Sequence, residues 1–233
     1  MILCILQARM SSRRCPGKVL APVLGEPMML HQIRRIRRAQ EIDELVVATS
    51  DQSSDDVIVE LCERSSTKSF RGSLDDVLDR FYQAALLYKP DHIVRLTADC
   101  PLIDPTIIDA TVSQHFSGEF DYTSNIETRS FPDGLDVEIC RLSALRRAWR
   151  EAKTDIDREH VTPYLRSGEF HTGHLTGCPD LSHHRWTVDY PDDLAFIRNI
   201  YGALYPQNPD FTMSDILQYV IENNCVRTQN RTI

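Results

Sequence analysis

The chain lacks the compositional features of disordered, fibrous and membrane-spanning proteins. Glycine occurs 9 times and proline 12 times among 233 residues, and charged residues make up 26%. This composition excludes collagen-like repeats and argues against disorder. No stretch approaches the roughly 18 apolar residues that would cross a bilayer. The first six residues carry no basic residue and Arg9 follows closely, so we expect a buried strand at 1–7 and neither a signal peptide nor a membrane partner.

Paired cysteines and an excess of positive charge are also missing. The seven cysteines are scattered, odd in number and form no CxxC motif, which predicts free thiols and a cytoplasmic location. Lysine and arginine number 26 against 34 acidic residues, a net charge of −8. We therefore expect no nucleic-acid partner. A local basic pocket for a phosphate-rich small molecule remains compatible with this charge.

Short apolar runs alternate with amphipathic helical patterns along the first half. The pattern predicts strands at 1–7, 45–48 and 93–96, and helices at 28–40, after Asp51, at 74–87 and at 105–116. In the helix at 28–40, Arg34, Arg35, Arg37 and Arg38 are expected mostly on a solvated face. This alternation predicts an α/β fold with a Rossmann-like, mostly parallel sheet and helices on both faces. Ligands bind such sheets at the carboxyl ends of the strands.

The second half is less regular but shows neither an internal repeat nor a low-complexity linker. We expect strands near 170–176 and 185–188, and helices at 142–152, 157–166, 191–204 and 213–222. The chain is therefore predicted to form a single domain over 1–233.

The loop after the first strand concentrates positive charge at the ligand-binding edge. Between residues 7 and 18 it carries Arg9, Arg13, Arg14 and Lys18. Cations and loop N–H groups are what a triphosphate requires, although the GxxxxGK[ST] spacing of a P-loop is absent. A solvated basic loop is the alternative, but Pro16 and Gly17 predict a fixed turn before Lys18.

The segment QARMSSRRCPGKVL at 7–20 resembles the signature of the cytidylyltransferases that make CMP-activated sugars. That family includes the 3-deoxy-manno-octulosonate and acylneuraminate enzymes, and the resemblance is closest to the branch of spore coat polysaccharide biosynthesis protein F. Further matching segments lie at 47–50, 71–80, 95–105, 131–138, 158–164 and 186–194. The resemblance implies a fold of the nucleotide-diphospho-sugar transferase type.

The implied reaction is transfer of CMP from CTP to a sugar or sugar acid, with release of pyrophosphate, for surface polysaccharide biosynthesis. The resemblance also implies Mg²⁺ as cofactor and a homodimer. Residues 1–118 would be the nucleotide-binding half. Residues 119–225 would bind the acceptor and could form the dimer contacts.

Asp99 and Asp189 each follow a predicted strand and are predicted to bind the metal. Mg²⁺ prefers hard oxygen ligands, and it is usually held by one or two carboxylates plus phosphate oxygens. The resemblance makes the same assignment, whereas a turn-forming or helix-capping role is the alternative for each residue. Arg13, Lys18 and Asp99 are the predicted catalytic residues.

The resemblance also implies a set of nucleotide-binding residues. Arg13 and Lys18 would bind the β- and γ-phosphates, and Arg9 would serve the α-phosphate or hold the loop. The main-chain groups of Leu6 and Ala8, with Arg71 and Ser73, would line the base and ribose pocket, and Ala98 is also among the nucleotide-binding residues. The sequence Thr97-Ala-Asp-Cys100 replaces the Q-G-D-E of the octulosonate enzymes, which leaves the preference for CTP open.

Two segments are predicted to bind the acceptor. They supply Asp133, Gly134, Asp136, Glu138, Arg158, Glu159 and His160. Carboxylates and positioned hydroxyl-orienting groups suit a sugar. A hairpin turn with solvated acids, and a helix start capped by Asp157, are the structural alternatives.

Competing chemistry is weaker in the sequence. His171, His174, Cys178, His183 and His184 match no zinc-finger spacing. Cys100 has no evident base for thiol catalysis. A nucleotidyltransferase for another base, a glycosyltransferase using a nucleotide sugar, and a nucleotide-binding scaffold remain the alternatives. An intact Arg13 and Lys18 favour a triphosphate over a nucleotide sugar.

Overall fold

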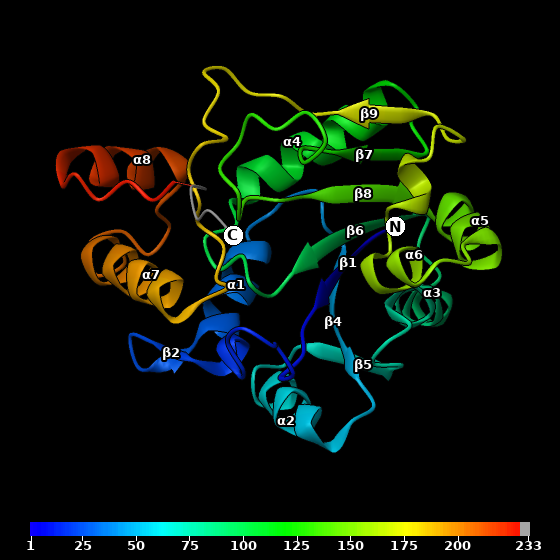
Figure 1. The fold of residues 1–233 in the computed structure, drawn as a ribbon, viewed down its shortest axis with the longest axis horizontal. Helices are drawn as coiled ribbons and strands as arrows, with labels where there is room; N and C mark the ends of the chain where they lie inside the picture. The colour runs from blue at the N-terminus through cyan, green and yellow to red at the C-terminus, as the bar shows by residue number, and fades with distance from the viewer. Residues whose placement is uncertain (229–233) are drawn as a thin grey trace.

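A seven-stranded sheet forms the centre of the computed structural model, which describes residues 1–228 (Figure 1). The strand order is β5-β4-β1-β6-β8-β7-β9. The strands are β1 (Ile2–Gln7), β4 (Glu44–Ser50), β5 (Lys68–Gly72), β6 (His92–Thr97), β7 (Tyr122–Ser124), β8 (Glu138–Arg141) and β9 (Thr172–His174). A separate small hairpin pairs β2 (Pro22–Val23) with β3 (Glu26–Pro27).

The sheet is mostly parallel, as predicted. β1 runs parallel to both β4 and β6, and β5 runs parallel to β4. β8 is antiparallel to its two neighbours β6 and β7, and β9 is parallel to β7. The predicted Rossmann-like α/β class is confirmed, with a mixed pairing pattern at one edge.

Eight α-helices are described. They are α1 (Met28–Ile36), α2 (Asp56–Arg64), α3 (Val77–Tyr88), α4 (Pro105–Ser117), α5 (Leu142–Glu151), α6 (Asp155–His160), α7 (Pro191–Leu204) and α8 (Met213–Glu222). Short 3₁₀ turns lie at Lys18–Leu20, Ser53–Asp55 and Tyr164–Arg166. Within residues 1–228, none of these helices has the length and apolar character needed to cross a membrane.

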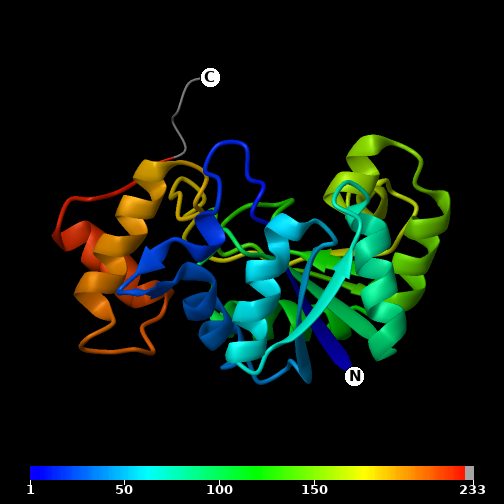
Figure 2. The same cartoon turned by 90° about the horizontal axis from the view of Figure 1, so that it is seen from below.

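Alternate residues of β1 face two separate cores. Cys4 and Leu6 pack with apolar residues of α1, α2, α4, α7 and α8, whereas Leu3 and Ile5 pack with those of α3 and α5. This alternation follows from the two-residue period of a strand, and both side chains of each pair are fully buried. Figure 2 shows α7 and α8 at one side of the molecule and α3 and α5 at the other. The sheet is therefore covered on both faces.

Three predicted elements differ from the structure. The first helix ends at Ile36 rather than at residue 40, because the chain tightens into a turn in which Ala39 N–H donates to Ile36 O. The helix expected at 157–166 is α6 followed by a 3₁₀ turn, and it is interrupted where Val161 takes a positive φ of 70°. Residues 185–188 do not form a strand, because Trp186 N–H and Val188 N–H donate to Asp133 O and Asp99 O in two different loops.

The basic face of α1 also differs in part. Arg35 is buried, with its Nε donating to Ile103 O at 2.6 Å and its guanidinium 4.4 Å from the Phe211 ring centre. The prediction of a solvated position is therefore wrong for Arg35. Its long side chain anchors α1 to the α4 side of the core.

Candidate active site

A cavity of about 430 Å³ opens at the carboxyl ends of β1 and β6. The loop after β1 contributes Ala8, Arg9, Ser12, Arg13, Arg14 and Lys18 to its lining. Thr97, Ala98 and Asp99 come from the end of β6, Glu159 and His160 from α6, and Asp189 from the segment before α7. The edge at which strand topology predicts ligand binding is therefore the edge that carries the cavity.

The conformation of the basic loop is fixed by hydrogen bonds to its backbone. Met10 N–H donates to Asp55 Oδ1 at 2.8 Å, and Gly17 N–H donates to Met10 O at 2.9 Å. Gly17 takes a left-handed φ of 72°, which glycine adopts without steric cost. Asp55 itself is fixed by Thr49 and Ser50 hydroxyls. The loop therefore forms a turn with a fixed conformation that positions Lys18 in the cavity, as Pro16 and Gly17 predict.

Lys18 brings the two predicted metal ligands together. Its Nζ lies 3.0 Å from Asp99 Oδ2, 3.3 Å from Asp189 Oδ1 and 2.6 Å from Val188 O. Burial alone would lower the pKa of Lys18, but the two carboxylates raise it above its usual value. The ammonium is therefore held in its charged form between two carboxylates.

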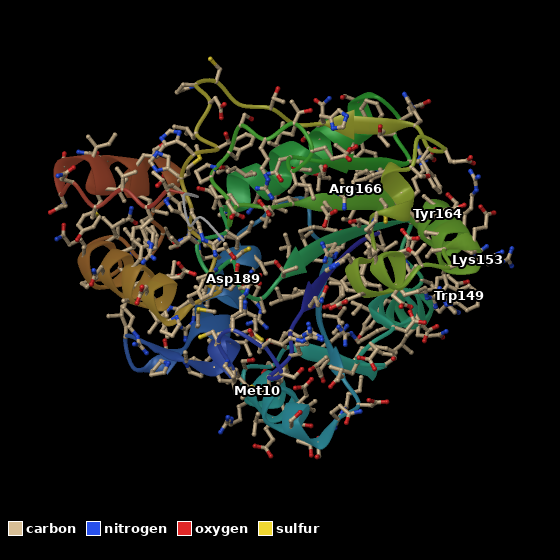
Figure 3. All side chains as sticks on the ribbon, viewed as in Figure 1. Met10, Trp149, Lys153, Tyr164, Arg166 and Asp189 are labelled. Carbon is tan, nitrogen blue, oxygen red and sulfur yellow. The ribbon has the colours of Figure 1, made fainter. Side chains whose placement is uncertain are left out.

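Asp189 has the most cationic surroundings in the cavity. Arg14 Nη2 lies 2.7 Å from its Oδ1, and Arg185 Nη2 lies 2.8 Å from its Oδ2. Burial would raise the pKa of Asp189, but Arg185, Lys18 and Arg14 lower it below its usual value. In Figure 3 the labelled Asp189 lies beside the end of β6. The carboxylate stays ionised, and its Oδ1 faces Lys18, which also contacts Asp99.

The carboxylate oxygens around Lys18 suit a divalent cation that prefers hard oxygen ligands. Oxygens of Asp99 and Asp189 already converge on one positive centre, and Mg²⁺ commonly takes one or two carboxylates together with substrate phosphates. Among residues 1–228, no group of three His, Cys, Asp or Glu side chains is arranged to hold a metal by itself. The site therefore fits a metal that is shared with a phosphate ligand better than a closed structural metal site.

The predicted nucleotide-binding residues divide into two sets. Arg9, Arg13, Ala8 and Ala98 line the cavity together with Lys18. The side chain of Leu6 is in the core, so only its main chain reaches this edge of the sheet.

Arg71 and Ser73 do not line the cavity. Arg71 donates to Asp56, Ser50 O and Gln52 O, and the Ser73 hydroxyl accepts from Asp76 N–H at 3.0 Å. Both side chains fix the turns that follow β4 and β5.

A second cavity of about 490 Å³ adjoins the first through Arg9, Arg13 and Glu159. Arg158 lies in this second cavity, where it forms an ion pair with Asp76 and donates to Trp149 O at 2.8 Å. Of the predicted acceptor residues, Glu159 and His160 line the first cavity. Arg9 Nη2 lies 3.7 Å from Glu159 Oε1, which links the basic loop to α6.

The acidic segment at 133–138 lies behind the cavity. Asp133 pairs with Arg185 at 3.0 Å, and Asp136 accepts two hydrogen bonds from Arg129 at 3.0 and 3.1 Å. Burial raises the pKa of both carboxyls above the usual value, although the arginines oppose this shift. These carboxylates are arginine-paired and do not line either cavity, so a sugar would have to displace those arginines to reach them.

Glu138 and Gly134 occupy interior positions. Glu138 is buried, ion-paired with Arg95, and accepts from Tyr122 Oη at 2.6 Å. Burial would raise the pKa of Glu138, but Arg95 and the hydroxyl donors lower it. Gly134 has φ 109°, and a Cβ there would lie 2.6 Å from Thr187 N. These positions favour structural roles over acceptor contact.

Five lining residues stand outside the predicted site, namely Gln7, Ser12, Arg14, Val19 and Thr97. Gln7 and Thr97 end strands at the ligand edge, so their position was the signal that could have identified them. Gln7 Oε1 accepts from Arg95 Nη2 at 3.4 Å, which connects the cavity floor to the buried Glu138. The sequence did not identify Arg185 as a partner of Asp189, because the segment around it has the apolar alternation of a buried strand.

The competing constellations find no support in the part of the chain described. The rings of His183 and His184 lie 4.2 Å apart at an angle of 36°. The histidines and Cys178 that the sequence disfavoured as a zinc site are not grouped as metal ligands among residues 1–228. Cys100 is buried, and burial raises its pKa well above the usual value. A thiolate nucleophile is therefore disfavoured at Cys100.

Comparisons with known proteins agree with this geometry. A cytidylyltransferase family model matches residues 3–181. The chain is 32% identical to the spore coat polysaccharide biosynthesis protein SpsF of Bacillus subtilis over 98% of this chain and 97% of that protein. It is 42% identical to an uncharacterized protein of Methanocaldococcus jannaschii over 70% of this chain and 66% of that relative.

Solved structures show the same arrangement. A cytidylyltransferase from Leptospira borgpetersenii superimposes with a TM-score of 0.92 at 30% identity, covering 100% of this chain and 98% of that one. CMP:2-keto-3-deoxy-manno-octonic acid synthetase in complex with CTP shares the fold, with a TM-score of 0.65 at 16% identity over 86% of this chain and 98% of that one. With the signature loop and paired carboxylates in place, the chain belongs to the cytidylyltransferase family.

Proposed function

We propose that this protein transfers CMP from CTP to a sugar or sugar acid in a Mg²⁺-dependent reaction. The observation that carries the proposal is the convergence of Asp99 and Asp189 on Lys18. This convergence occurs in a cavity that also holds Arg9 and Arg13. A metal-binding carboxylate pair next to phosphate-binding cations is what nucleotidyl transfer requires.

The chemistry is an in-line substitution at the α-phosphorus. An acceptor hydroxyl oxygen forms a bond to phosphorus, the bond to the bridging oxygen of the β-phosphate breaks, and pyrophosphate leaves with that electron pair. Arg13 and Lys18 would bind the β- and γ-phosphates and stabilise the charge that develops on the leaving group. Arg9 would serve the α-phosphate or hold the loop through its contact with Glu159. Mg²⁺, held by Asp99 and Asp189, would neutralise phosphate oxygens.

The acceptor would enter from the side of α6. Glu159 and His160 line the cavity there and can orient a hydroxyl or take its proton. Arg158, in the adjoining cavity, would become available to an anionic group only by leaving Asp76. Contacts of Asp133 and Asp136 with the acceptor would likewise require release from Arg185 and Arg129.

The biological setting is part of the same proposal. The names of SpsF and of the CMP-octonic acid synthetase support a sugar acceptor and a role in surface polysaccharide biosynthesis. Seven free cysteines support a reducing, cytoplasmic environment.

A homodimer through residues after 119 is proposed from the family resemblance. The edge strand β9 lies in that half. Light scattering on the purified protein measures the oligomeric state, and a mass of one chain would contradict the proposed dimer.

The decisive experiment measures pyrophosphate release with Mg²⁺ and CTP, UTP, GTP or ATP against a panel of keto-acid sugars and sugar phosphates. CTP-dependent release should be lost in Asp99→Ala. It should persist in Asp210→Ala, which removes a surface carboxylate paired only with Arg38 among the described residues.

Other outcomes would redirect the proposal. Release with UTP, GTP or ATP in place of CTP would point to another base specificity. Absence of release, together with absence of Mg²⁺-dependent CTP binding, would contradict the proposal and favour a glycosyltransferase or a nucleotide-binding scaffold.

A further inference from the structure

Arg185 contacts three carboxylates at once. Its guanidinium lies 3.0 Å from Asp133 Oδ2, 2.8 Å from Asp189 Oδ2 and 3.3 Å from Asp193 Oδ2. Only 16% of the Arg185 side chain is exposed, so these charges meet in a partly desolvated place. A guanidinium presents five N–H donors in a rigid planar fork, whereas an ammonium presents three rotatable donors on a flexible stem.

The two carboxylate oxygens of Asp189 have different partners. Oδ2 faces Arg185, whereas Oδ1 faces Lys18 and Arg14 inside the cavity. A carboxylate whose one oxygen is tied by a guanidinium offers the other oxygen to a ligand. With Oδ2 bound to Arg185, Oδ1 is the oxygen that Asp189 presents to the cavity, beside the Lys18 ammonium that also contacts Asp99.

The backbone around Asp189 is fixed from the same cluster. Asp193 Oδ2 accepts the N–H groups of Asp189 and Tyr190, each at 2.9 Å, at the start of α7. Arg227 pairs with the other oxygen of Asp193 at 3.2 Å. Asp193 therefore binds the main chain of Asp189 directly, and it is linked to the Asp189 carboxylate through Arg185.

Arg185 also connects Asp189 to the segment that carries Asp133. Asp133 N–H donates to His184 O at 3.0 Å, and Trp186 N–H donates to Asp133 O at 2.6 Å. The two segments thus run together through backbone bonds on either side of the Arg185–Asp133 ion pair. A displacement of the Asp133 loop would be transmitted to Asp189 through this guanidinium.

We infer that Arg185 is a positioning residue for the metal-binding carboxylate. It binds Asp189 Oδ2, leaves Oδ1 facing Lys18 and Arg14 in the cavity, and couples Asp189 to the 129–136 loop. The inference rests on the proposed function, because it assigns a role toward the metal that Asp99 and Asp189 would bind. Groups that orient metal ligands from outside commonly contribute 10- to 100-fold to metal affinity.

The test is Mn²⁺ binding, measured by electron paramagnetic resonance with CTP present and no acceptor. Arg185→Met should weaken Mn²⁺ binding by about 10- to 100-fold. Arg185→Lys should fall between wild type and Arg185→Met, because an ammonium keeps the charge but lacks the rigid planar donor set of a guanidinium. Arg147→Met is the matched control, since Arg147 also pairs with two carboxylates, those of Glu151 and Glu169, but lies on α5 and lines neither cavity. Its Mn²⁺ affinity should equal that of wild type.

Two further readouts separate positioning from loss of structure. Near-ultraviolet circular dichroism reports on the buried Trp186 next to Arg185, and CTP binding in EDTA reports on the cavity without metal. Both should stay close to wild type in Arg185→Lys while Mn²⁺ binding weakens. If Arg185→Met does not fold, Arg185→Lys decides alone.

Each remaining outcome has a distinct meaning. Wild-type Mn²⁺ affinity in folded Arg185 variants would overturn the role of Arg185 and leave the proposed function intact. Parallel loss of metal-free CTP binding and Mn²⁺ binding would also overturn it, since that pattern indicates a general structural role. Failure of the wild-type protein to bind Mn²⁺ with CTP would overturn the proposed metal site, and this inference with it.

Discussion

Single side chains carry several contacts each in this cavity, and Lys18 is the clearest case. Its ammonium is buried, contacts two carboxylates and a carbonyl, and follows a turn that is fixed by Gly17. Any substitution there changes both the charge available to a triphosphate and the charge balance of Asp99 and Asp189.

Replacing Lys18 by methionine keeps the length of the side chain and removes its charge. We expect Lys18→Met to lower kcat for pyrophosphate release by about 100- to 1,000-fold, the range found when one preorganised charge-stabilising donor is removed. Lys153→Met is the control, because Lys153 is exposed and lies far from the labelled Asp189 (Figure 3). Equal kcat values for wild type and Lys18→Met would remove Lys18 from the mechanism.

Gly134 is the residue whose backbone limits substitution most clearly. Gly134→Ala should destabilise the protein by about 1–3 kcal/mol from backbone strain, with further loss from the contact at 2.6 Å with Thr187 N. Gly202→Ala, in the interior of α7 with nothing near its Cβ, should instead stabilise by up to about 1 kcal/mol. Urea unfolding monitored by tryptophan fluorescence measures both, and a neutral Gly134→Ala would contradict the geometry.

At the scale of elements, the contact between α4 and β7 contains a buried histidine, His115. His115 on α4 lies 3.0 Å from Thr123 Oγ1 on β7 and 3.0 Å from His92 Nδ1 on β6. Desolvation lowers the pKa of His115 to about 4. The folded protein therefore holds this imidazole neutral at pH values where an unfolded chain would protonate it.

This pKa predicts a pH dependence of stability. Between pH 6.5 and about 4 the unfolded chain binds more protons at His115 than the folded chain, so stability falls as the pH decreases. Thermal unfolding from pH 7.5 to 4.5 should show a falling Tm, and His115→Gln should have a shallower slope over the same range. Parallel slopes for the two proteins would exclude His115 as a source of the effect.

At the scale of the whole molecule, the basic loop stands out against an acidic protein. The net charge is −8, yet Arg9, Arg13, Arg14 and Lys18 meet at one cavity. A triphosphate is therefore attracted locally while the remaining surface repels it, and salt screens the attraction over a distance of about 10 Å at 0.1 M.

This arrangement predicts that the KM for CTP rises with ionic strength. Between about 50 and 300 mM KCl we expect a several-fold increase in KM with a smaller change in kcat, because screening acts on encounter and binding. Initial rates at saturating Mg²⁺ measure it, with sodium chloride as a check against a specific potassium effect. A KM independent of salt would show that the cations are already neutralised by the acids around them.

The sequence by itself determined the layout of the molecule. The alternation of apolar runs and helical patterns predicts the parallel strands β1, β4 and β6. Buried side chains recur with a period of two residues in a strand and 3.6 in a helix, so the sequence shows which kind of element each segment forms. The loop at 7–18 and the strand-end positions of Asp99 and Asp189 follow from the same local signals. Local pattern was sufficient because strand ends meet at one edge whatever the details of packing.

Only the tertiary structure decided which charged residues share the cavity. Lys18 and Asp189 are 171 residues apart, and Arg95 and Glu138 are 43 apart. No local pattern distinguishes Glu138, buried against Arg95, from Glu159, which lines the cavity. The sequence around Arg185 likewise predicts a strand. In the structure the neighbouring residues Trp186 and Val188 instead donate backbone hydrogen bonds to the loops of Asp133 and Asp99. Long-range packing and desolvation set these roles, because the energy of a charge depends on what surrounds it in space.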